Sequence, residues 1–198
     1  MKQRSDFNPE RWDERYKVRD TPWDIGYASP ALMNFALKNI SKTAKILIPG
    51  AGNGWEAEAL HRMGYNNVWV CDWSSSAMEG FKMRVRDFPR EHLLVTDYFQ
   101  LEGPFDFILE QTFFSSLPKD LRAKYASKCQ MLLQPGGILA GLLFMTEFEF
   151  DGPPFGGTIE EYKTLFTPFF NLLELAPSKD SIKPRLGKEC FMILQAKK

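Results

Sequence analysis

The chain has 198 residues, and its 25 Lys and Arg side chains balance its 25 Asp and Glu side chains. Without net charge there is no long-range field that draws it to nucleic acid or to an anionic membrane, so we expect neither partner. The length predicts a single domain over residues 1–198, large enough to bury a core without structural staples.

The cysteines and histidines are too scattered along the chain to indicate a disulfide framework or a structural metal site. The three cysteines contain no C-x-x-C pair and the two histidines have no ligand-like spacing, so we expect no metal. The start of the chain has no apolar leader, and no run of 18 apolar residues occurs. We expect a cytoplasmic protein that acts as a monomer, with a dimer as the alternative.

Strands and helices alternate along most of the chain. Apolar runs predict strands at 46–48, 68–71, 92–95, 105–109 and 138–144. The patterns between them are typical of helices at 31–37, 55–63, 74–87 and 117–133. A further helix is predicted at 158–166, followed by strands at 169–175 and 189–195.

The connection between the last two strands differs from the others. Its roughly 13 residues include Pro177, Pro184 and Gly187, which makes it too short and too rich in Pro and Gly for a crossover helix. These two strands should therefore be antiparallel neighbours. The prediction is an α/β fold with a seven-stranded, mostly parallel sheet, a C-terminal antiparallel hairpin and helices on both faces.

The turn after the first strand carries the pattern of a nucleoside-cofactor site. Gly50 and Gly52 belong to a G-x-G-x-G sequence, and Trp55 stands where a dinucleotide fingerprint needs its third glycine. Asp72 ends the second strand, where a carboxylate accepts hydrogen bonds from ribose hydroxyls, and Trp73 follows it as a further cofactor-binding candidate. The spacing favours S-adenosylmethionine over NAD, and a tight turn without a ligand is the alternative.

Residues 1–27 form an N-terminal arm ahead of the alternating elements. It contains Trp12, Tyr16 and Trp23. Aromatic faces attract a cation such as a sulfonium by roughly 0.5–2 kcal/mol per contact, and an indole N–H can donate to a carboxylate. The arm is therefore predicted to be a lid over the cofactor, and the alternative is a hydrophobic latch that covers the edge of the core.

Polar residues follow the third and fourth strands, where α/β sheets bind their ligands. Asp97 is placed to accept from the adenine amino group, with a turn or helix cap as the alternative. Tyr98 could stack on the purine or plug the top of the sheet. Gln111 is predicted to face the transferred methyl group. The chain lacks an Asn/Asp-Pro-Pro-aromatic tetrapeptide there, which argues against methylation of DNA or RNA.

Methyl transfer from a sulfonium to a soft anion needs desolvation and alignment more than a strong base. Arg185 lies on the loop between the last two strands. Its charge would attract an anionic nucleophile or lower the pKa of a thiol. A bridge from Arg185 to Glu189 is the alternative. Arg185 and Gln111 are the two candidate catalytic residues.

Six short blocks occur in one order, namely Trp12…Tyr16…Thr21-Pro-Trp-Asp-x-Gly26, Ile48-Pro-Gly-x-Gly52, Thr96-Asp-Tyr-Phe99, Phe105-Asp…Thr112-Phe-Phe114, Gly152-Pro-Pro-Phe155 and Arg185-x-Gly-Lys-Glu189. Together they resemble the thiopurine S-methyltransferase family, particularly its thiol and halide methyltransferase branch. The resemblance implies a Rossmann-like class I methyltransferase fold and S-adenosylmethionine as cofactor. It implies a small-molecule acceptor such as a thiol, a thiopurine, hydrosulfide, thiocyanate or a halide.

The same resemblance implies roles for single residues. Trp12, Tyr16 and Trp23 would contact the methionine part of the cofactor. Gln111 would line the methyl-transfer pocket. Two other function classes stay open, an O- or N-methyltransferase of another small molecule and a non-catalytic S-adenosylmethionine-binding regulator. The first would need a base or metal near the fourth strand, and the second would have an obstructed pocket above Gln111.

Overall fold

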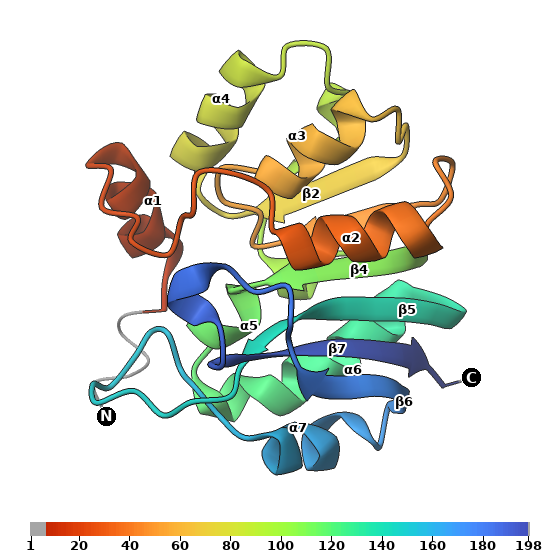
Figure 1. The fold of residues 1–198 in the computed structure, drawn as a ribbon. Helices are drawn as coiled ribbons and strands as arrows, with labels where there is room; N and C mark the ends of the chain where they lie inside the picture. The colour runs from red at the N-terminus through yellow and green to blue at the C-terminus, as the bar shows by residue number, and fades with distance from the viewer. Residues whose placement is uncertain (1–6, 198) are drawn as a thin grey trace.

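Seven strands form one mixed sheet in the order β3-β2-β1-β4-β5-β7-β6 (Figure 1). The computed structural model describes residues 7–197, so residues 1–6 of the predicted arm lie outside the described residues. The strands are β1 (Ile46–Pro49), β2 (Val68–Asp72), β3 (Leu93–Val95), β4 (Phe105–Gln111), β5 (Leu133–Phe144), β6 (Phe170–Pro177) and β7 (Glu189–Ala196). Strands β1 to β5 are parallel, whereas β7 is antiparallel to β5 and β6. The predicted fold class is confirmed.

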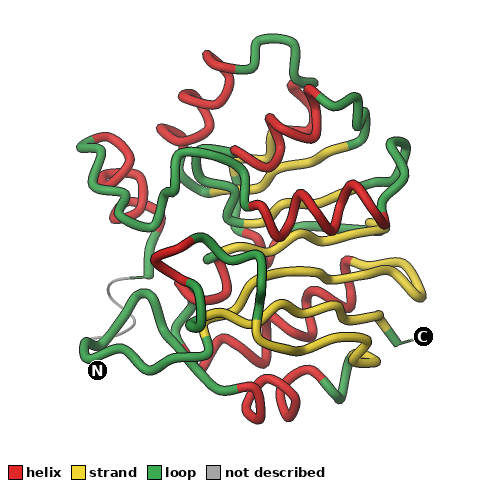
Figure 2. Tube along the Cα trace, in the orientation of Figure 1, coloured by secondary structure: helices red, strands yellow, loops and turns green. Residues whose placement is uncertain are grey.

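Helices cover both faces of the sheet because successive strand residues point to opposite sides. The helices are α1 (Pro9–Lys17), α2 (Pro30–Asn39), α3 (Trp55–Arg62), α4 (Ser75–Arg84), α5 (Phe113–Ser116), α6 (Arg122–Leu132) and α7 (Ile159–Phe166). Ile46 and Ile48 pack in a core with side chains of α2, α3 and α4, while Leu47 between them packs with α5, α6 and α7. The arrowheads in Figure 1 show that the parallel strands end on the side where α1 lies, and the loops after β5 and β6 lie on that side as well (Figure 2).

The sequence analysis does not predict α1. This helix begins with a signal that is present in the sequence, because Asn8 precedes Pro9 and the Asn8 side chain accepts a hydrogen bond from the Arg11 N–H at 2.8 Å. Asn at the N-cap followed by Pro at the first helical position is a favoured helix start. The arm is therefore partly helical rather than an irregular extension.

The predicted helix at 117–133 is shorter in the structure. A 3₁₀ turn over Lys119–Leu121 precedes α6, and β5 already begins at Leu133. The segment 134–137, which lies between the predicted helix and the predicted strand, belongs to the first part of β5. The pairing register with β4 shifts between Phe105 and Phe107, and such irregularities accommodate a proline that has no N–H to donate.

The carboxyl group of Glu110 is completely buried near the end of β4. It accepts hydrogen bonds from the Phe114 N–H at 3.0 Å and from the Tyr125 hydroxyl at 2.8 Å, which joins β4 to α5 and α6. Burial raises the pKa of Glu110 to about 7, although these hydrogen bonds oppose the shift. The turn that follows β4 and leads into α5 is unusual, since Thr112 has a φ of 64°, in the left-handed region.

We expect Glu110 to make the stability of the protein depend on pH. A carboxyl group with a raised pKa binds more protons in the folded chain than in the unfolded chain between about 4.5 and 7. Its contribution to stability is therefore fullest below this window and is lost as the pH rises through it. Urea unfolding should show that Glu110→Gln gains stability relative to the parent across the window, by up to about 3 kcal/mol.

The exposed Glu102 supplies a matched control, because Glu102→Gln should leave the pH dependence of the unfolding free energy unchanged. Identical pH profiles for the parent and Glu110→Gln would contradict the titration assigned to Glu110.

Candidate functional site

A cavity of about 440 Å³ opens at the carboxyl ends of the parallel strands. Three parts of the chain surround it. The turns after β1, β2, β3 and β4 form its floor, the N-terminal arm forms one wall, and the loops after β5 and before β7 form the other. Its volume lies within the range of about 300–1,000 Å³ that is usual for small-molecule sites.

The glycine-rich turn is fixed to the end of β2 by Asp72. Gly50 and Gly52 have φ angles of 56° and 53°, which glycine adopts without the steric cost of a Cβ. The Gly52 N–H donates to Asp72 Oδ2 at 2.8 Å, and the Ser74 N–H donates to Asp72 Oδ1 at 2.9 Å. A carboxylate has about four acceptor positions, so Asp72 can still bind ligand hydroxyls. Burial raises the pKa of Asp72, and the backbone N–H groups of Ser74, Gly52 and Trp73 oppose the rise.

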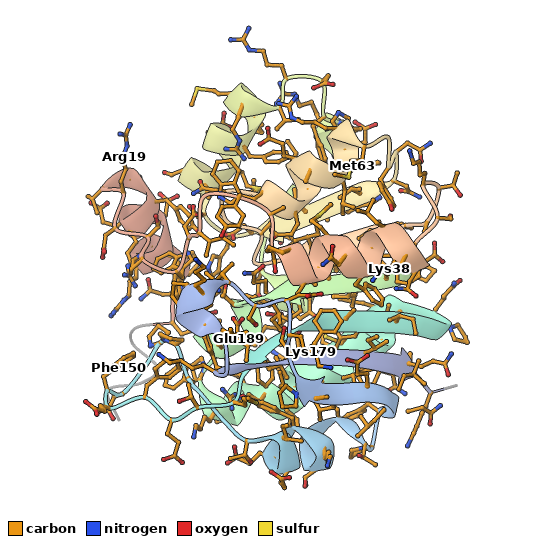
Figure 3. All side chains as sticks on the ribbon, in the orientation of Figure 1. Arg19, Lys38, Met63, Phe150, Lys179 and Glu189 are labelled. Carbon is orange, nitrogen blue, oxygen red and sulfur yellow. The ribbon has the colours of Figure 1, made fainter. Side chains whose placement is uncertain are left out.

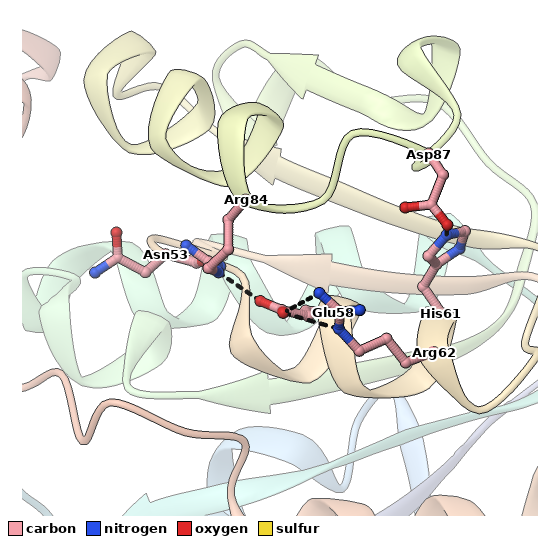
Figure 4. Close-up of polar contacts among 6 residues, drawn as sticks. All are labelled: Asn53, Glu58, His61, Arg62, Arg84 and Asp87. Carbon is pink, nitrogen blue, oxygen red and sulfur yellow. Dashed lines mark hydrogen bonds and ion pairs between the residues drawn. The ribbon is translucent and has the colours of Figure 1, made fainter.

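Side chains of α3 and α4 support the other side of this turn (Figure 4). Arg84 donates to the backbone carbonyl of Asn53 and pairs with Glu58, which also pairs with Arg62 at 2.9 Å. The Arg84 guanidinium lies 4.1 Å from the ring centroid of Trp55. The turn is therefore held by Asp72 on one side and by a charged cluster on the other.

The turns after β2 and β3 line the cavity with Asp72, Trp73, Asp97 and Tyr98. Asp97 Oδ1 accepts from the Phe99 N–H at 2.9 Å, so Asp97 is a cap as well as a cavity residue. Tyr98 is buried, and its hydroxyl lies 3.0 Å from Cys129 Sγ. Burial raises the Tyr98 pKa. Both readings of Asp97 and Tyr98 from the sequence are therefore compatible with their positions.

The arm contributes Trp12, Tyr16 and Trp23 to the cavity wall. Trp23 Nε1 donates to the Tyr16 hydroxyl at 3.4 Å, and the centroids of the Trp12 and Trp23 rings are 5.2 Å apart. A Cβ at Gly52 would collide with the Tyr16 hydroxyl, which therefore lies directly over the glycine-rich turn. The three predicted arm residues are brought together at the cavity.

Two carboxylates fasten the arm to the fold. Asp13 Oδ1 accepts from the Ser74 hydroxyl at 2.9 Å and from the Ser76 N–H at 2.8 Å. Asp24 accepts from Trp55 Nε1 at 2.7 Å. Burial raises the Asp13 pKa, but hydrogen bonds from Lys17, Ser76 and Ser74 outweigh it and hold the pKa well below its usual range. The arm is thus docked at the start of α4 and at the start of α3.

The opposite wall is aromatic and basic. It consists of Phe144, Phe148, Phe150, Pro153, Pro154, Pro184, Arg185 and Lys188. Phe150 is 56% exposed, and Figure 3 shows it at the outer edge of the loop after β5, so it lies at the mouth of the cavity. Glu189 lies inward from this wall and is buried.

Arg185 combines the two roles considered from the sequence. It lines the cavity, and it also donates from Nη2 to the Trp23 carbonyl at 2.6 Å and lies 3.6 Å from Glu189 Oε1. Its guanidinium is 5.6 Å from the Phe144 ring centroid. The side chain is 12% exposed, which keeps its charge partly desolvated beside the cavity.

Gln111 does not line the large cavity. It lines a neighbouring cavity of about 60 Å³ with Glu56, Asp24 and residues of the glycine-rich turn. Sequence reasoning also did not single out Glu56, although a glutamate in the first turn of α3 is a detectable feature. Within residues 7–197, no group of three or more His, Cys, Asp or Glu side chains could hold a metal ion.

The sequence profile of the thiopurine S-methyltransferase family matches residues 7–196. The chain belongs to this family. It is an S-adenosylmethionine-dependent methyltransferase. The family resemblance, the fold class, the enzyme class and the cofactor that were expected from the sequence are confirmed. No helix in the described part of the chain is long and apolar enough to cross a membrane.

Relatives extend over most of the chain. It is 27% identical over 184 residues to the probable thiol methyltransferase 2 of Arabidopsis thaliana, covering 90% of this chain and 81% of that protein. It is 24% identical to the thiopurine S-methyltransferase of Vibrio atlanticus, with 92% of each protein covered.

Solved structures share the fold at lower identity. The 1,6-didemethyltoxoflavin-N1-methyltransferase of Burkholderia thailandensis, with bound S-adenosylhomocysteine, matches with a TM-score of 0.76 and 18% identity over 96% of this chain and 87% of that one. The glycopeptide N-methyltransferase MtfA, also with S-adenosylhomocysteine, matches with a TM-score of 0.70 and 14% identity over 96% of this chain and 98% of that one.

We expect the Asp13 contacts to matter for cofactor binding, because they hold α1 and its aromatic residues over the cavity. Asp13→Ala should weaken S-adenosylhomocysteine binding about 5- to 30-fold in isothermal titration, as two or more charge-assisted hydrogen bonds are lost. Asp87→Ala is the control, since the exposed Asp87 pairs with His61 of α3 and does not line the cavity, so this change should leave the affinity unchanged. Equal affinity for both variants would show that the arm docks independently of Asp13.

Proposed function

We propose that the enzyme methylates a small soft nucleophile, with thiols preferred and thiocyanate or halide ions second. The observation that carries this proposal is the composition of the cavity wall opposite the arm, which we call the acceptor wall. In this wall, aromatic rings and prolines surround Arg185 and Lys188. That wall, as described, includes no His, Asp or Glu that could serve as a general base. Nucleophiles that are anionic already, or that ionise easily, suit such a site best. The relatives named for thiol, thiocyanate and thiopurine methylation support the same class.

S-adenosylmethionine supplies an electrophilic methyl group on a sulfonium. We propose that Asp72 accepts hydrogen bonds from the ribose, that Asp97 and Tyr98 flank the adenine, and that Trp73 and the glycine-rich turn complete this half of the site. Gly50 and Gly52 allow the backbone to approach the cofactor closely. In this proposal Trp12, Tyr16 and Trp23 close over the methionine part and exclude water.

The acceptor half acts through desolvation and charge. A soft anion is weakly hydrated, so transfer from water to a cavity walled by Phe144 and Phe148 costs it little compared with a hard oxygen anion. The Arg185 guanidinium favours the anionic form of a thiol and lowers its pKa. No proton needs to be removed in the transfer step once the thiolate is bound, which agrees with the absence of a base from this described wall.

A panel of acceptors tests the proposed class. The purified enzyme with S-adenosylmethionine should methylate aryl thiols, thiopurines or hydrosulfide most efficiently, and thiocyanate or iodide more slowly. Formation of S-adenosylhomocysteine and of the methylated product would be measured together by chromatography. Turnover of a catechol or an amine, with none of any thiol or halide, would refute the acceptor class.

We expect Arg185→Met to lower kcat/KM for a thiol by about 10- to 1,000-fold, or roughly 1.4–4 kcal/mol of transition-state stabilisation. The decrease in kcat/KM for the thiol should exceed the decrease in affinity for the cofactor, although the hydrogen bond from Arg185 to the Trp23 carbonyl also disappears. Arg86→Met is the matched control, because Arg86 is exposed on the loop after α4. Full activity in Arg185→Met, or a loss confined to cofactor affinity, would remove Arg185 from the acceptor step.

A further inference from the structure

The smaller cavity beside the glycine-rich turn contains a buried carboxylate with no role in the mechanism so far. Glu56 lies in the first turn of α3 and is 9% exposed. Its Oε1 accepts from the Ser29 N–H at 2.9 Å, at the start of α2. A carboxylate this deeply buried is costly unless donors or a cation surround it. The donors around the Glu56 carboxylate therefore indicate which groups it orients.

The amide of Gln111 connects Glu56 to Arg185. We assign the amide the orientation that its partners require, in which its nitrogen donates to Glu56 Oε1 at 3.0 Å and to the Ser29 hydroxyl at 3.3 Å. Its oxygen then accepts from Arg185 Nη1 at 3.3 Å. The opposite orientation would place the amide oxygen against the carboxylate and its NH₂ against the guanidinium. Carboxylate, amide and guanidinium thus form a line of alternating acceptors and donors.

This line ends on a guanidinium that is restrained from three directions. Arg185 meets the Gln111 oxygen, the Trp23 carbonyl at 2.6 Å and Glu189 Oε1 at 3.6 Å. These acceptors come from β4, the arm and β7, respectively. Arginine has five N–H donors in a rigid plane, so several fixed acceptors determine its orientation.

We propose that Glu56 and Gln111 are positioning residues that hold the Arg185 guanidinium at the acceptor half of the cavity. The inference rests on the proposed function, because it gives Arg185 its role toward the acceptor. Glu56 can only accept hydrogen bonds when ionised, so it fixes the amide nitrogen of Gln111 on its own side. The amide oxygen must then face Arg185. Burial raises the pKa of Glu56, while the N–H groups of Ser29 and Glu56, and to a smaller extent the charge of Arg185, favour its ionised form.

The contacts also explain why Gln111 stays outside the large cavity. Its amide is engaged at both ends by protein groups, so it acts on the acceptor through Arg185 rather than by touching the methyl group. This differs from the position expected from the sequence, where the side chain after the fourth strand faces the transferred methyl.

A mutant cycle tests the proposal. Gln111→Met keeps the length of the side chain and removes both polar ends. It should lower kcat/KM for a thiol about 5- to 50-fold while the Kd for S-adenosylhomocysteine changes less than about threefold. In an Arg185→Met background, the same substitution should cause almost no further loss, because the residue that it positions is already gone. Gln134→Met, at an exposed position in β5, is the control.

A polarity swap supplies a second test that does not depend on a loss of activity. In Glu56→Gln combined with Gln111→Glu, the amide at 56 can donate to the carboxylate at 111, which accepts from Arg185. This double variant should keep kcat/KM within about fivefold of the parent, well above Gln111→Met, at a similar Tm.

Three results would overturn the inference. The first is a parent-like kcat/KM in Gln111→Met. The second is a double variant whose decrease in kcat/KM equals the product of the decreases in Gln111→Met and Arg185→Met, and the third is a polarity-swapped variant as impaired as Gln111→Met. Failure of the proposed function is a separate result, because the parent enzyme itself would then turn over no thiol or halide. A Gln111→Met chain that does not fold leaves the swapped variant to decide, since that variant keeps a donor facing an acceptor at both junctions of the line, between positions 56 and 111 and between position 111 and Arg185.

Discussion

The site depends on one buried carboxylate. Asp72 holds the N–H groups of Gly52 and Ser74, and thereby fixes the glycine-rich turn after β1 to the turn that opens α4. Because Asp72 is buried, both of its oxygens need donors, and left-handed backbone at the glycines points one of those donors toward it. The same carboxylate faces the cavity. One interaction therefore shapes the floor of the site and places a carboxylate at the cavity.

The arm completes the cavity through a second set of carboxylates. Asp13 meets the start of α4 and Asp24 meets the start of α3, the two helices that follow the turns after β2 and β1. Tyr16 and Trp23 are held between these anchors. Arg185 then joins the arm to the C-terminal hairpin through the Trp23 carbonyl. Trp23 therefore contacts both Tyr16 on the arm and Arg185 on the opposite wall of the cavity.

Charged side chains line the cavity on all its sides. Asp72 and Asp97 lie on the turns after β2 and β3, and Arg15 lies on the arm. Arg185 and Lys188 lie on the opposite wall among phenylalanines and prolines. This aromatic and basic wall suits the proposed acceptor, which is anionic and weakly hydrated. The buried line from Glu56 through Gln111 to Arg185 crosses between the halves and keeps the cation on the acceptor side.

The sequence by itself determined the fold class and indicated the cofactor, because both are recorded in short-range pattern. Alternating apolar runs define the strands, the G-x-G-x-G turn together with the family resemblance indicates the cofactor, and the brevity of the last connection forces an antiparallel pair. Only the tertiary structure decided the positions of Gln111, Glu56 and Arg185. Their partners come from β4, α3 and the β6–β7 connection, so no local spacing records that they meet, and the orientation of an amide depends entirely on what lies at its two ends.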